Sequence, residues 1–234
     1  LDGYAAVFSD DSILVGYWNS IKYTVVGTIF SVVMIYITAY PLSNPDLPGR
    51  KFFNIFFVIT MYFGGGLVPF YLLIKALGLI DSFWVMVLPT GVSVTYMLII
   101  SSNMSALPKE LEESAQLDGA SDVTILFRII LPLTLPILAT FTLYYAVERW
   151  NEWYNAMLFL KTTDLWPLQL TLRNIISSAN FVSTQAMTGD IRPPTYGEGV
   201  KMACIVVTVF PLMAVYPFLQ RYFLTGLTLG AVKG

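Results

Sequence analysis

The chain has 234 residues, of which 56% are hydrophobic and 12% are charged, and a soluble domain of this size could not bury so much apolar surface. The composition therefore predicts an integral membrane protein. The sequence has no His, one Cys and a net charge of −2 without a basic run, which argues against a His-based triad or metal site, an intramolecular disulfide and a nucleic-acid partner.

Five apolar segments are each long enough to cross a hydrocarbon core of about 30 Å at 1.5 Å per helical residue. They follow a polar lead-in at residues 1–18 and run over 19–40, 52–77, 83–104, 125–147 and 200–223. Three glycines at 64–66 interrupt the second segment. They form either a hinge or a place where a neighbouring helix approaches closely, and we favour close packing. The third segment contains Pro89, which membrane helices tolerate when neighbours satisfy the backbone.

A strongly polar stretch at residues 105–124 separates the third and fourth segments. Pro108 suits the first turn of a helix, and the glutamates that follow it suit the positive end of the helix dipole. Gly119 stands where a left-handed C-terminal cap is expected, and residues 120–122 can restart a helix. The sequence therefore predicts a short helix, a tight glycine turn and a second helix that enters the membrane. Taken alone, the same pattern also fits an ordinary amphipathic surface helix.

The spacing in this stretch resembles the EAA loop of binding-protein-dependent ABC importer permeases. That loop reads Glu-Ala-Ala, three residues, Gly, nine residues, then Ile-x-Leu-Pro. This chain has Glu-Ser-Ala at 113–115, Gly119, and Ile-Ile-Leu-Pro at 129–132, with every spacing kept. Ser114 departs from the pattern, but it is small enough to pack like alanine.

The resemblance extends along the chain. The ending at 220–234 and the Asn-Ser pair at 19–20 are similar to MalG-type subunits of carbohydrate importers. The runs at 62–69 and 77–81 resemble one branch of that group, the Gram-positive permeases tied to complex-oligosaccharide uptake. This resemblance implies an all-α fold, a polytopic membrane helical bundle of the type I ABC importer permease kind. It implies one transmembrane domain over 1–234, with the first of six spans absent from this chain.

The resemblance also implies a pore subunit without catalytic activity, cofactor or metal of its own, in the bacterial plasma membrane. Its expected partners are a second, homologous permease, two ATP-binding subunits that hold ATP and Mg²⁺, and an extracellular solute-binding protein that delivers a sugar or oligosaccharide. The 105–124 loop would be cytoplasmic and would dock its helix in a cleft of the ATPase. The coupling residues implied are Glu110, Glu112, Glu113, Ser114, Ala115, Leu117, Asp118, Gly119 and Ala120.

The segment between the fourth and fifth spans would then face outward, with an extracellular loop at 161–198. The candidates for contact with the binding protein are Arg173, Asn174, Arg192 and Tyr196, and the alternative is a passive connector. Just before this loop lie the candidates for a substrate path, which are Glu148, Trp150, Asn151, Glu152 and Trp153. Glu148 and Glu152 share a helix face if the fourth helix continues that far. Trp rings stack on sugars, so this cluster is either a sugar passage or an interfacial aromatic belt.

Two other classes of function remain as alternatives. An ion-coupled secondary transporter for small polar solutes usually has inverted repeats, and no such pairing is visible here. A membrane-embedded enzyme needs a nucleophile or a metal site, which the absence of His disfavours, and a glycosidase needs a soluble cleft around its two carboxylates. By analogy with the family branch, the expected substrate is an oligosaccharide from a plant or algal polysaccharide, such as a pectin fragment.

Overall fold

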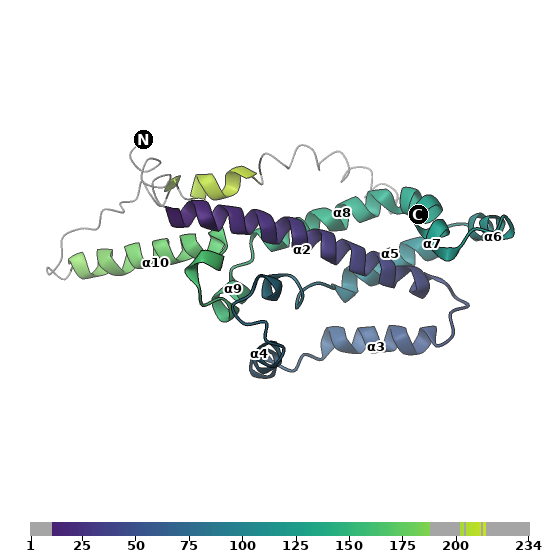
Figure 1. The fold of residues 1–234 in the computed structure, drawn as a ribbon, viewed down its shortest axis with the longest axis horizontal. Helices are drawn as coiled ribbons and strands as arrows, with labels where there is room; N and C mark the ends of the chain where they lie inside the picture. Colours follow the sequence, from purple (N-terminus) through teal and green to yellow (C-terminus); the bar gives the residue numbers. More distant parts are fainter. Residues whose placement is uncertain (1–10, 188–201, 204, 212, 214–234) are drawn as a thin grey trace. The chain divides into compact units, whose positions relative to one another are not determined.

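The structure, a computed structural model, describes residues 11–187, 202–203, 205–211 and 213, and every regular element in that part of the chain is helical (Figure 1). The predicted all-α fold is therefore confirmed. The elements are α2 (Asp11–Ser43), α3 (Arg50–Tyr62), α4 (Leu67–Ala76), the 3₁₀ turn η1 (Phe83–Met86), α5 (Val94–Ser105), α6 (Glu110–Leu117), α7 (Asp122–Ile125), the π-helical segment η2 (Leu126–Ile130), α8 (Leu131–Trp150), α9 (Tyr154–Phe159), the 3₁₀ turn η3 (Thr163–Leu165) and α10 (Leu168–Met187).

Two helices in the described residues are long and apolar enough to cross a membrane. They are α2, with 33 residues, and the continuous rod Asp122–Trp150, with 29 residues. They correspond to the first and fourth predicted spans. The bent pair of α3 and α4 adds a third candidate. The fifth predicted span, 200–223, lies partly outside the described residues, and those of its residues that are described are helical.

The second predicted span is not a straight helix. α3 and α4 meet at an angle of 112° across residues 63–66. Gly66 has a φ of 86°, which glycine adopts without the steric cost of a Cβ. A Cβ on Gly64 or Gly66 would meet no atom within 4 Å. The glycines therefore form a bend, and no described part of this chain lies against Gly64 or Gly66, so the structure favours the hinge interpretation over close packing within the chain.

The third predicted span is also broken. Instead of one helix over 83–104, the chain forms η1 and then the 12-residue α5. Pro89 lies between them, lacks an N–H, and disfavours helical backbone in the residue before it. The side chain of Ser93 then caps α5 by accepting a hydrogen bond from the Tyr96 N–H. The Ser93 N–H donates to the hydroxyl of Tyr145 at 2.8 Å, so the start of α5 is satisfied from α8 as well.

The chain divides into two compact units, each with its own buried core. Unit 1 comprises Leu1–Gly27, Tyr71–Leu88 and Ala146–Phe218, and unit 2 comprises Thr28–Phe70, Pro89–Tyr145 and Leu219–Gly234. The described core of unit 1 contains Ile13, Trp150, Leu168, Leu172 and Ala203. The described core of unit 2 contains Ile35, Tyr36, Ala39, Leu42, Met97, Ile100, Met104, Ala115, Ile125, Leu126, Ile130, Phe141 and Tyr145.

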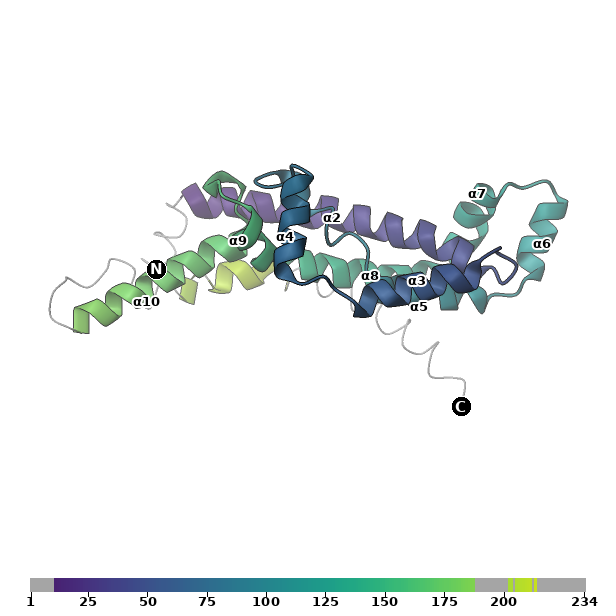
Figure 2. The ribbon, with the colours of Figure 1, turned by 90° about the horizontal axis from the view of Figure 1, so that it is seen from below.

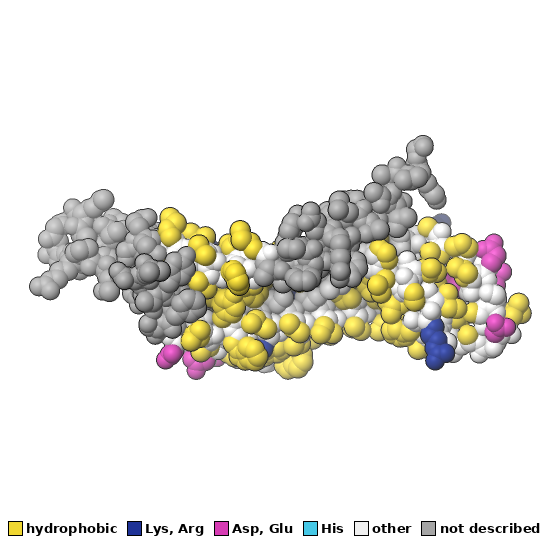
Figure 3. Space-filling view, turned by 90° about the horizontal axis from the view of Figure 1, so that it is seen from above, with side chains coloured by type: hydrophobic (Ala, Val, Ile, Leu, Met, Phe, Trp, Pro, Cys, Tyr) yellow, Lys and Arg dark blue, Asp and Glu magenta, His cyan; other side chains and the backbone are white. Residues whose placement is uncertain are grey.

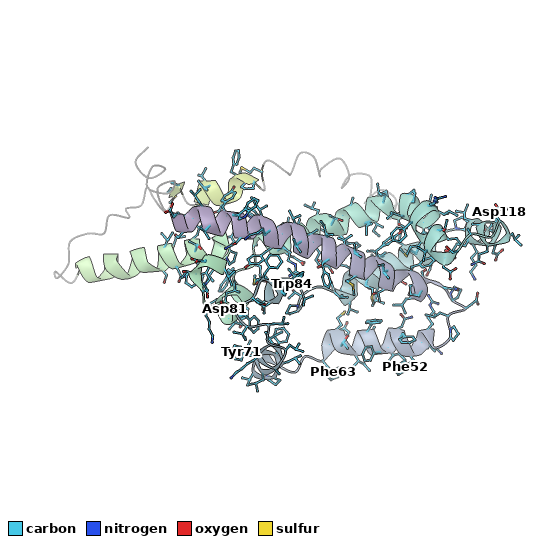
Figure 4. All side chains as sticks on the ribbon, in the orientation of Figure 1. Phe52, Phe63, Tyr71, Asp81, Trp84 and Asp118 are labelled. Carbon is cyan, nitrogen blue, oxygen red and sulfur yellow. The ribbon has the colours of Figure 1, made fainter. Side chains whose placement is uncertain are left out.

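α3 buries none of its residues within this chain. Phe52, on this helix, and Phe63, which follows it, are labelled in Figure 4 and are 68% and 78% exposed. Apolar side chains left outside a core are expected where a helix contacts lipid or another membrane chain. This exposure agrees with the membrane environment that the composition predicts.

Candidate functional site

The predicted coupling residues lie on α6 and on the turn that follows it, at one end of unit 2 (Figure 2). Ala115 is buried and joins the unit 2 core, so this face of α6 is fastened to the unit. Glu112 and Ala120 are half-buried, and Leu117 is 90% exposed. The other exposed coupling residues are Glu110, Glu113, Ser114, Asp118 and Gly119. The helix therefore exposes an acidic surface that also contains Leu117 and the less exposed Leu111, and Figure 3 shows acidic side chains gathered at this end.

The turn after α6 has the geometry of a Schellman cap. The Ala120 N–H donates to the Ala115 carbonyl at 2.9 Å, and the Gly119 N–H donates to the Gln116 carbonyl at 3.0 Å. Gly119 has a φ of 81°, which confirms the predicted left-handed cap. A Cβ on Gly119 would meet no atom within 4 Å. Glycine is therefore favoured by the backbone conformation and not by lack of space.

The restart of the helix is capped two residues later. The Ser121 side chain accepts a hydrogen bond from the Thr124 N–H, and α7 begins at Asp122, as predicted. We call residues 105–124 the elbow, because two capped helices meet there across one glycine. The end of α6 and the start of α7 are each satisfied by local bonds, so the connection between the two helices is stiff.

A π-helical segment, η2, follows α7 within the same rod. The Leu131 N–H donates to the Leu126 carbonyl, five residues earlier. Pro132 comes next and has no N–H, so the ladder is already incomplete at this point. Such π-helical turns are rare and are often found at functional sites. The Leu-Pro pair that ends the EAA pattern therefore marks a local change in helix geometry.

Two cavities flank the base of α6. One, of about 310 Å³, is lined by Ser43, Asn44, Pro45, Asp46, Arg50, Met104, Ser105, Leu107, Lys109, Glu112, Glu113 and Gln116. The other, of about 400 Å³, is lined by Ile37, Tyr40, Pro41, Asn44, Leu47, Glu112, Gln116, Asp122, Val123 and Leu126. Glu112 borders both. Partial burial raises the pKa of its carboxyl, the negative charge of Asp122 raises it further, and Lys109 opposes this.

The loop between α2 and α3 braces the elbow. The Ser105 hydroxyl donates to the Ser43 carbonyl at 2.8 Å, and the Arg50 Nε donates to the Leu42 carbonyl, also at 2.8 Å. Lys109 and Asp46 form an ion pair at 3.8 Å. Both side chains are largely exposed, so this pair contributes little stability. The hydrogen bond from Ser105 is therefore the main link to the elbow, whereas the bond from Arg50 closes the α2–α3 loop itself. The sequence indicated neither bond.

The candidate substrate-path residues are not all on one surface of unit 1. Trp150 is buried. Its ring packs edge-on against Tyr17 at a ring distance of 5.6 Å, and its indole N–H donates to the Thr208 carbonyl at 3.3 Å.

The other candidates lie around the end of α8. Asn151 and Glu148 are exposed. α8 ends at Trp150, and Glu152 accepts hydrogen bonds from the backbone and side-chain nitrogens of Asn155, each at 3.0 Å. Glu148 and Glu152 therefore do not share a helix face, because α8 ends before Glu152, which instead bonds to Asn155 in α9.

Trp153 and Arg173, predicted for two different roles, lie together. The Arg173 guanidinium carbon is 3.7 Å from the centre of the Trp153 ring, which is a cation–π contact. Asn174 is exposed on α10, a 20-residue helix that occupies much of the predicted 161–198 loop. α10 forms because Leu168 and Leu172, four residues apart, enter the unit 1 core together. Arg192 and Tyr196 lie outside the described residues.

Arg149 is a buried residue whose place in unit 1 the sequence did not reveal. Its guanidinium donates to the Met86 carbonyl at 2.6 Å and to the Val87 carbonyl at 3.3 Å. Gly27 leaves room for it, because a Cβ there would lie 3.1 Å from the Arg149 Nε. Arg149 thus satisfies carbonyls at the end of η1, where the predicted third span breaks. Non-helical backbone at membrane depth needs such partners.

Asp81 forms a second long-range contact in unit 1. It lies in the loop after α4 and is labelled in Figure 4. Its carboxylate accepts hydrogen bonds from the N–H groups of Lys161 and Thr162, at 2.8 and 2.9 Å, and from the Thr162 hydroxyl at 2.6 Å. These bonds, led by that from the Thr162 hydroxyl, hold the pKa of the Asp81 carboxyl below its usual value. We call residues 161–164, which are all exposed, the exposed turn.

α2 holds the other side of the exposed turn. The Asn19 side chain donates to the carbonyls of Asp164 and Trp166, at 2.7 and 3.0 Å, and the Tyr23 hydroxyl donates to the Leu165 carbonyl at 2.8 Å. Neither Asp81 nor Asn19 had been assigned a role from the sequence. The sequence indicated their importance only in that Asp81 and Asn19 each lie in a short run that resembles the MalG-type subunits.

The chain is similar in sequence to known transport proteins. It matches the family described as "Binding-protein-dependent transport system inner membrane component" over residues 12–228. It is 42% identical over 235 residues to the polygalacturonan/rhamnogalacturonan transport system permease protein YtcP of Bacillus subtilis, covering all of this chain and 82% of that protein. It is 40% identical over 234 residues to Protein LplC of Bacillus subtilis, covering all of this chain and 79% of that protein.

A solved structure agrees with these sequence relatives. It is the crystal structure of a bacterial ABC transporter involved in the import of the acidic polysaccharide alginate. The TM-score is 0.84 at 33% identity, and the match covers 94% of this chain and 79% of that chain. The resemblance inferred from the EAA spacing is confirmed, and the chain belongs to the family of binding-protein-dependent inner membrane components, the permeases of ABC importers.

Proposed function

We propose that this chain is the non-catalytic permease subunit of a bacterial ATP-driven importer that moves oligosaccharides from an extracellular binding protein to the cytoplasm. It would cross the plasma membrane several times, paired with a second, homologous permease. Two ATP-binding subunits would hold ATP and Mg²⁺ on the cytoplasmic side. Family membership supports this assignment over an ion-coupled secondary transporter.

The elbow is the observation that carries the proposal. A capped helix fixed to unit 2 through Ala115, with its acidic face and Leu117 exposed, suits insertion into a cleft on an ATPase. Because the Schellman cap and the Ser121 cap restrict movement between α6 and α7, a displacement of α6 would also move α7 and the rest of the rod Asp122–Trp150. The acidic first turn can pair with cations in the cleft.

Helix length supports a transmembrane position for α2. It has 33 residues and is about 50 Å long, which exceeds the hydrocarbon core of about 30 Å. Its last turn carries Ser43, whose carbonyl accepts a hydrogen bond from Ser105, the first residue of the elbow. In the topology that the family resemblance implies, the elbow is cytoplasmic and the segment that contains the exposed turn faces outward.

The names of two relatives guide the choice of substrate. The polysaccharides in these names, polygalacturonan and alginate, are acidic, so oligogalacturonides are the first solutes to test. Within the candidate substrate path, Glu148 and Asn151 are exposed and Glu152 and Trp153 are half-buried, so these four residues remain candidates. Trp150 is buried in the unit 1 core and is not a candidate for direct contact with the solute.

The proposal is tested by reconstituting the chain with its partner permease, the ATPase subunits and the binding protein in liposomes. ATP hydrolysis is expected to rise when the binding protein is added, with uptake of oligogalacturonide into the vesicles. Glu113→Lys is expected to lower uptake at least about tenfold, since it reverses a charge on the exposed face of α6. Glu113→Gln, its matched control, should retain more uptake. The proposal is wrong if the binding protein does not change ATP hydrolysis in the unmodified complex.

A further inference from the structure

The backbone of the exposed turn is held by more long-range hydrogen bonds than a surface loop needs. All four of its residues, 161–164, are exposed, yet their backbone is bonded from two sides. Asp81 accepts three hydrogen bonds from Lys161 and Thr162, and Asn19 donates to the Asp164 carbonyl. These partners are 80 or more residues away in the sequence. Surface loops without such bonds usually adopt many conformations.

Asp81 contributes its backbone as well as its side chain. Its N–H donates to the Phe159 carbonyl at 2.9 Å, next to the exposed turn. Its φ is 57°, and it is the one non-glycine residue with a positive φ in the described part of the chain. Aspartate tolerates this conformation better than most residues, but at an energetic cost. Backbone strain of this kind persists where the surrounding structure holds it and is often found at functional positions.

We propose that Asp81 is a positioning residue that holds the exposed turn as a preformed docking surface for the extracellular solute-binding protein. This inference rests on the proposed function, which puts the exposed turn on the outer side of the membrane. A surface that is already ordered loses less conformational entropy when a partner binds. Lys161 and Asp164 offer charges of both signs on that surface, which suits the polar rim of a transient protein–protein contact.

The test separates the carboxylate of Asp81 from its unusual backbone. Asp81→Gly keeps the positive φ accessible and removes all three accepted hydrogen bonds. Asp81→Asn also tolerates the backbone and keeps one acceptor oxygen for the two N–H groups. Each variant complex is reconstituted in nanodiscs, and ATP hydrolysis is measured while the importer's own binding protein is titrated.

For Asp81→Gly we expect the half-saturating concentration of binding protein to rise about tenfold, because the turn must be ordered on binding. The basal rate, the maximal rate and the yield of assembled complex should stay the same. Asp81→Asn should recover most of the affinity. Hydrogen exchange at the Lys161 and Thr162 amides should be faster in Asp81→Gly than in the unmodified complex. Asp11→Asn, which removes an aspartate at the start of α2, is the matched control and should change none of these quantities.

Several outcomes would overturn the proposal. An unchanged half-saturating concentration in Asp81→Gly would show that the ordered turn does not serve docking. A loss of maximal rate or of complex yield, with the same half-saturating concentration, would assign Asp81 a structural role only, or a contact with the second permease. If the unmodified complex itself does not respond to the binding protein, the proposed function fails first, and the two failures are thereby distinguished.

Discussion

The elbow and the exposed turn are both stiff, but they are built in different ways. The glycine turn of the elbow is closed by bonds between residues at most five apart, such as that from the Ala120 N–H to the Ala115 carbonyl. The exposed turn is closed by bonds between residues far apart in the sequence, such as those from Asn19 to Asp164 and from Thr162 to Asp81. The first kind of stiffness belongs to a short stretch of sequence, whereas the second depends on distant segments being brought together.

This difference has consequences for mutation. A local cap fails when one residue loses its conformational freedom, and the rest of the fold can remain intact. A long-range contact fails when either partner is removed or when the packing between them shifts. Substitution of Gly119 tests the local cap and substitution of Arg149 tests a long-range contact, and the larger effect is expected at Gly119.

Gly119 should be the most sensitive position of the elbow. At a φ of 81°, a residue with a Cβ costs about 1–2 kcal/mol, and a β-branched residue costs more. Gly119→Val is expected to lower uptake at least about tenfold while the chain still inserts in the membrane and ATP hydrolysis continues. The measurement is the amount of solute taken up per ATP hydrolysed in proteoliposomes.

Two milder variants show whether backbone conformation is the cause. No atom lies within 4 Å of a Cβ at this position, so side-chain size should matter little. Asparagine adopts positive φ more readily than alanine. Gly119→Asn should therefore couple better than Gly119→Ala, although its side chain is larger. Equal coupling by the two variants would count against a role for the left-handed cap.

Arg149→Met should destabilise unit 1. The change removes the two hydrogen bonds to the Met86 and Val87 carbonyls, and a buried polar group without its partner costs about 1–3 kcal/mol. For a chain of this length, that corresponds to a fall of several degrees in the midpoint of thermal unfolding in detergent. Arg128→Met, at an exposed cation on η2, is the control and should leave the midpoint nearly unchanged. The same fall in both variants would refute a specific role for Arg149.

Glu112→Gln should give the smallest effect, and it should depend on pH. Burial and Asp122 raise the pKa of Glu112 above its usual 4.5, so the folded state disfavours the charged form. This penalty is present at neutral pH and disappears as the pH falls through the raised pKa towards 4.5. The glutamine variant should thus be more stable at pH 7, by less than about 1 kcal/mol because the carboxyl is partly in water.

The comparison is made by unfolding both proteins in denaturant at pH 7 and at pH 4. The gain of the Glu112→Gln variant should vanish at the lower pH, where glutamate is also neutral. A gain that persisted or grew at pH 4 would show that packing, and not charge, determines the difference.

The sequence was sufficient wherever the structure depends on neighbours along the chain. It predicted the all-helical fold, the first and fourth spans, the left-handed conformation of Gly119 and the restart of the helix near Asp122. It was insufficient for the second and third spans, because an apolar run does not reveal whether Gly66 or Pro89 will be accommodated in a helix or will end it. It also suggested a shared helix face for Glu148 and Glu152, which the end of α8 at Trp150 rules out.

By itself, then, the amino-acid order determined the membrane character, the elbow and the family, since apolar run length, cap residues and fixed spacing are properties of contiguous sequence. The tertiary structure alone decided that Arg149 satisfies the broken third span, that Trp150 is buried and that Asp81 and Asn19 hold the exposed turn. These contacts join residues more than 50 positions apart. A side chain can satisfy such distant backbone groups only after packing has brought them within hydrogen-bonding distance.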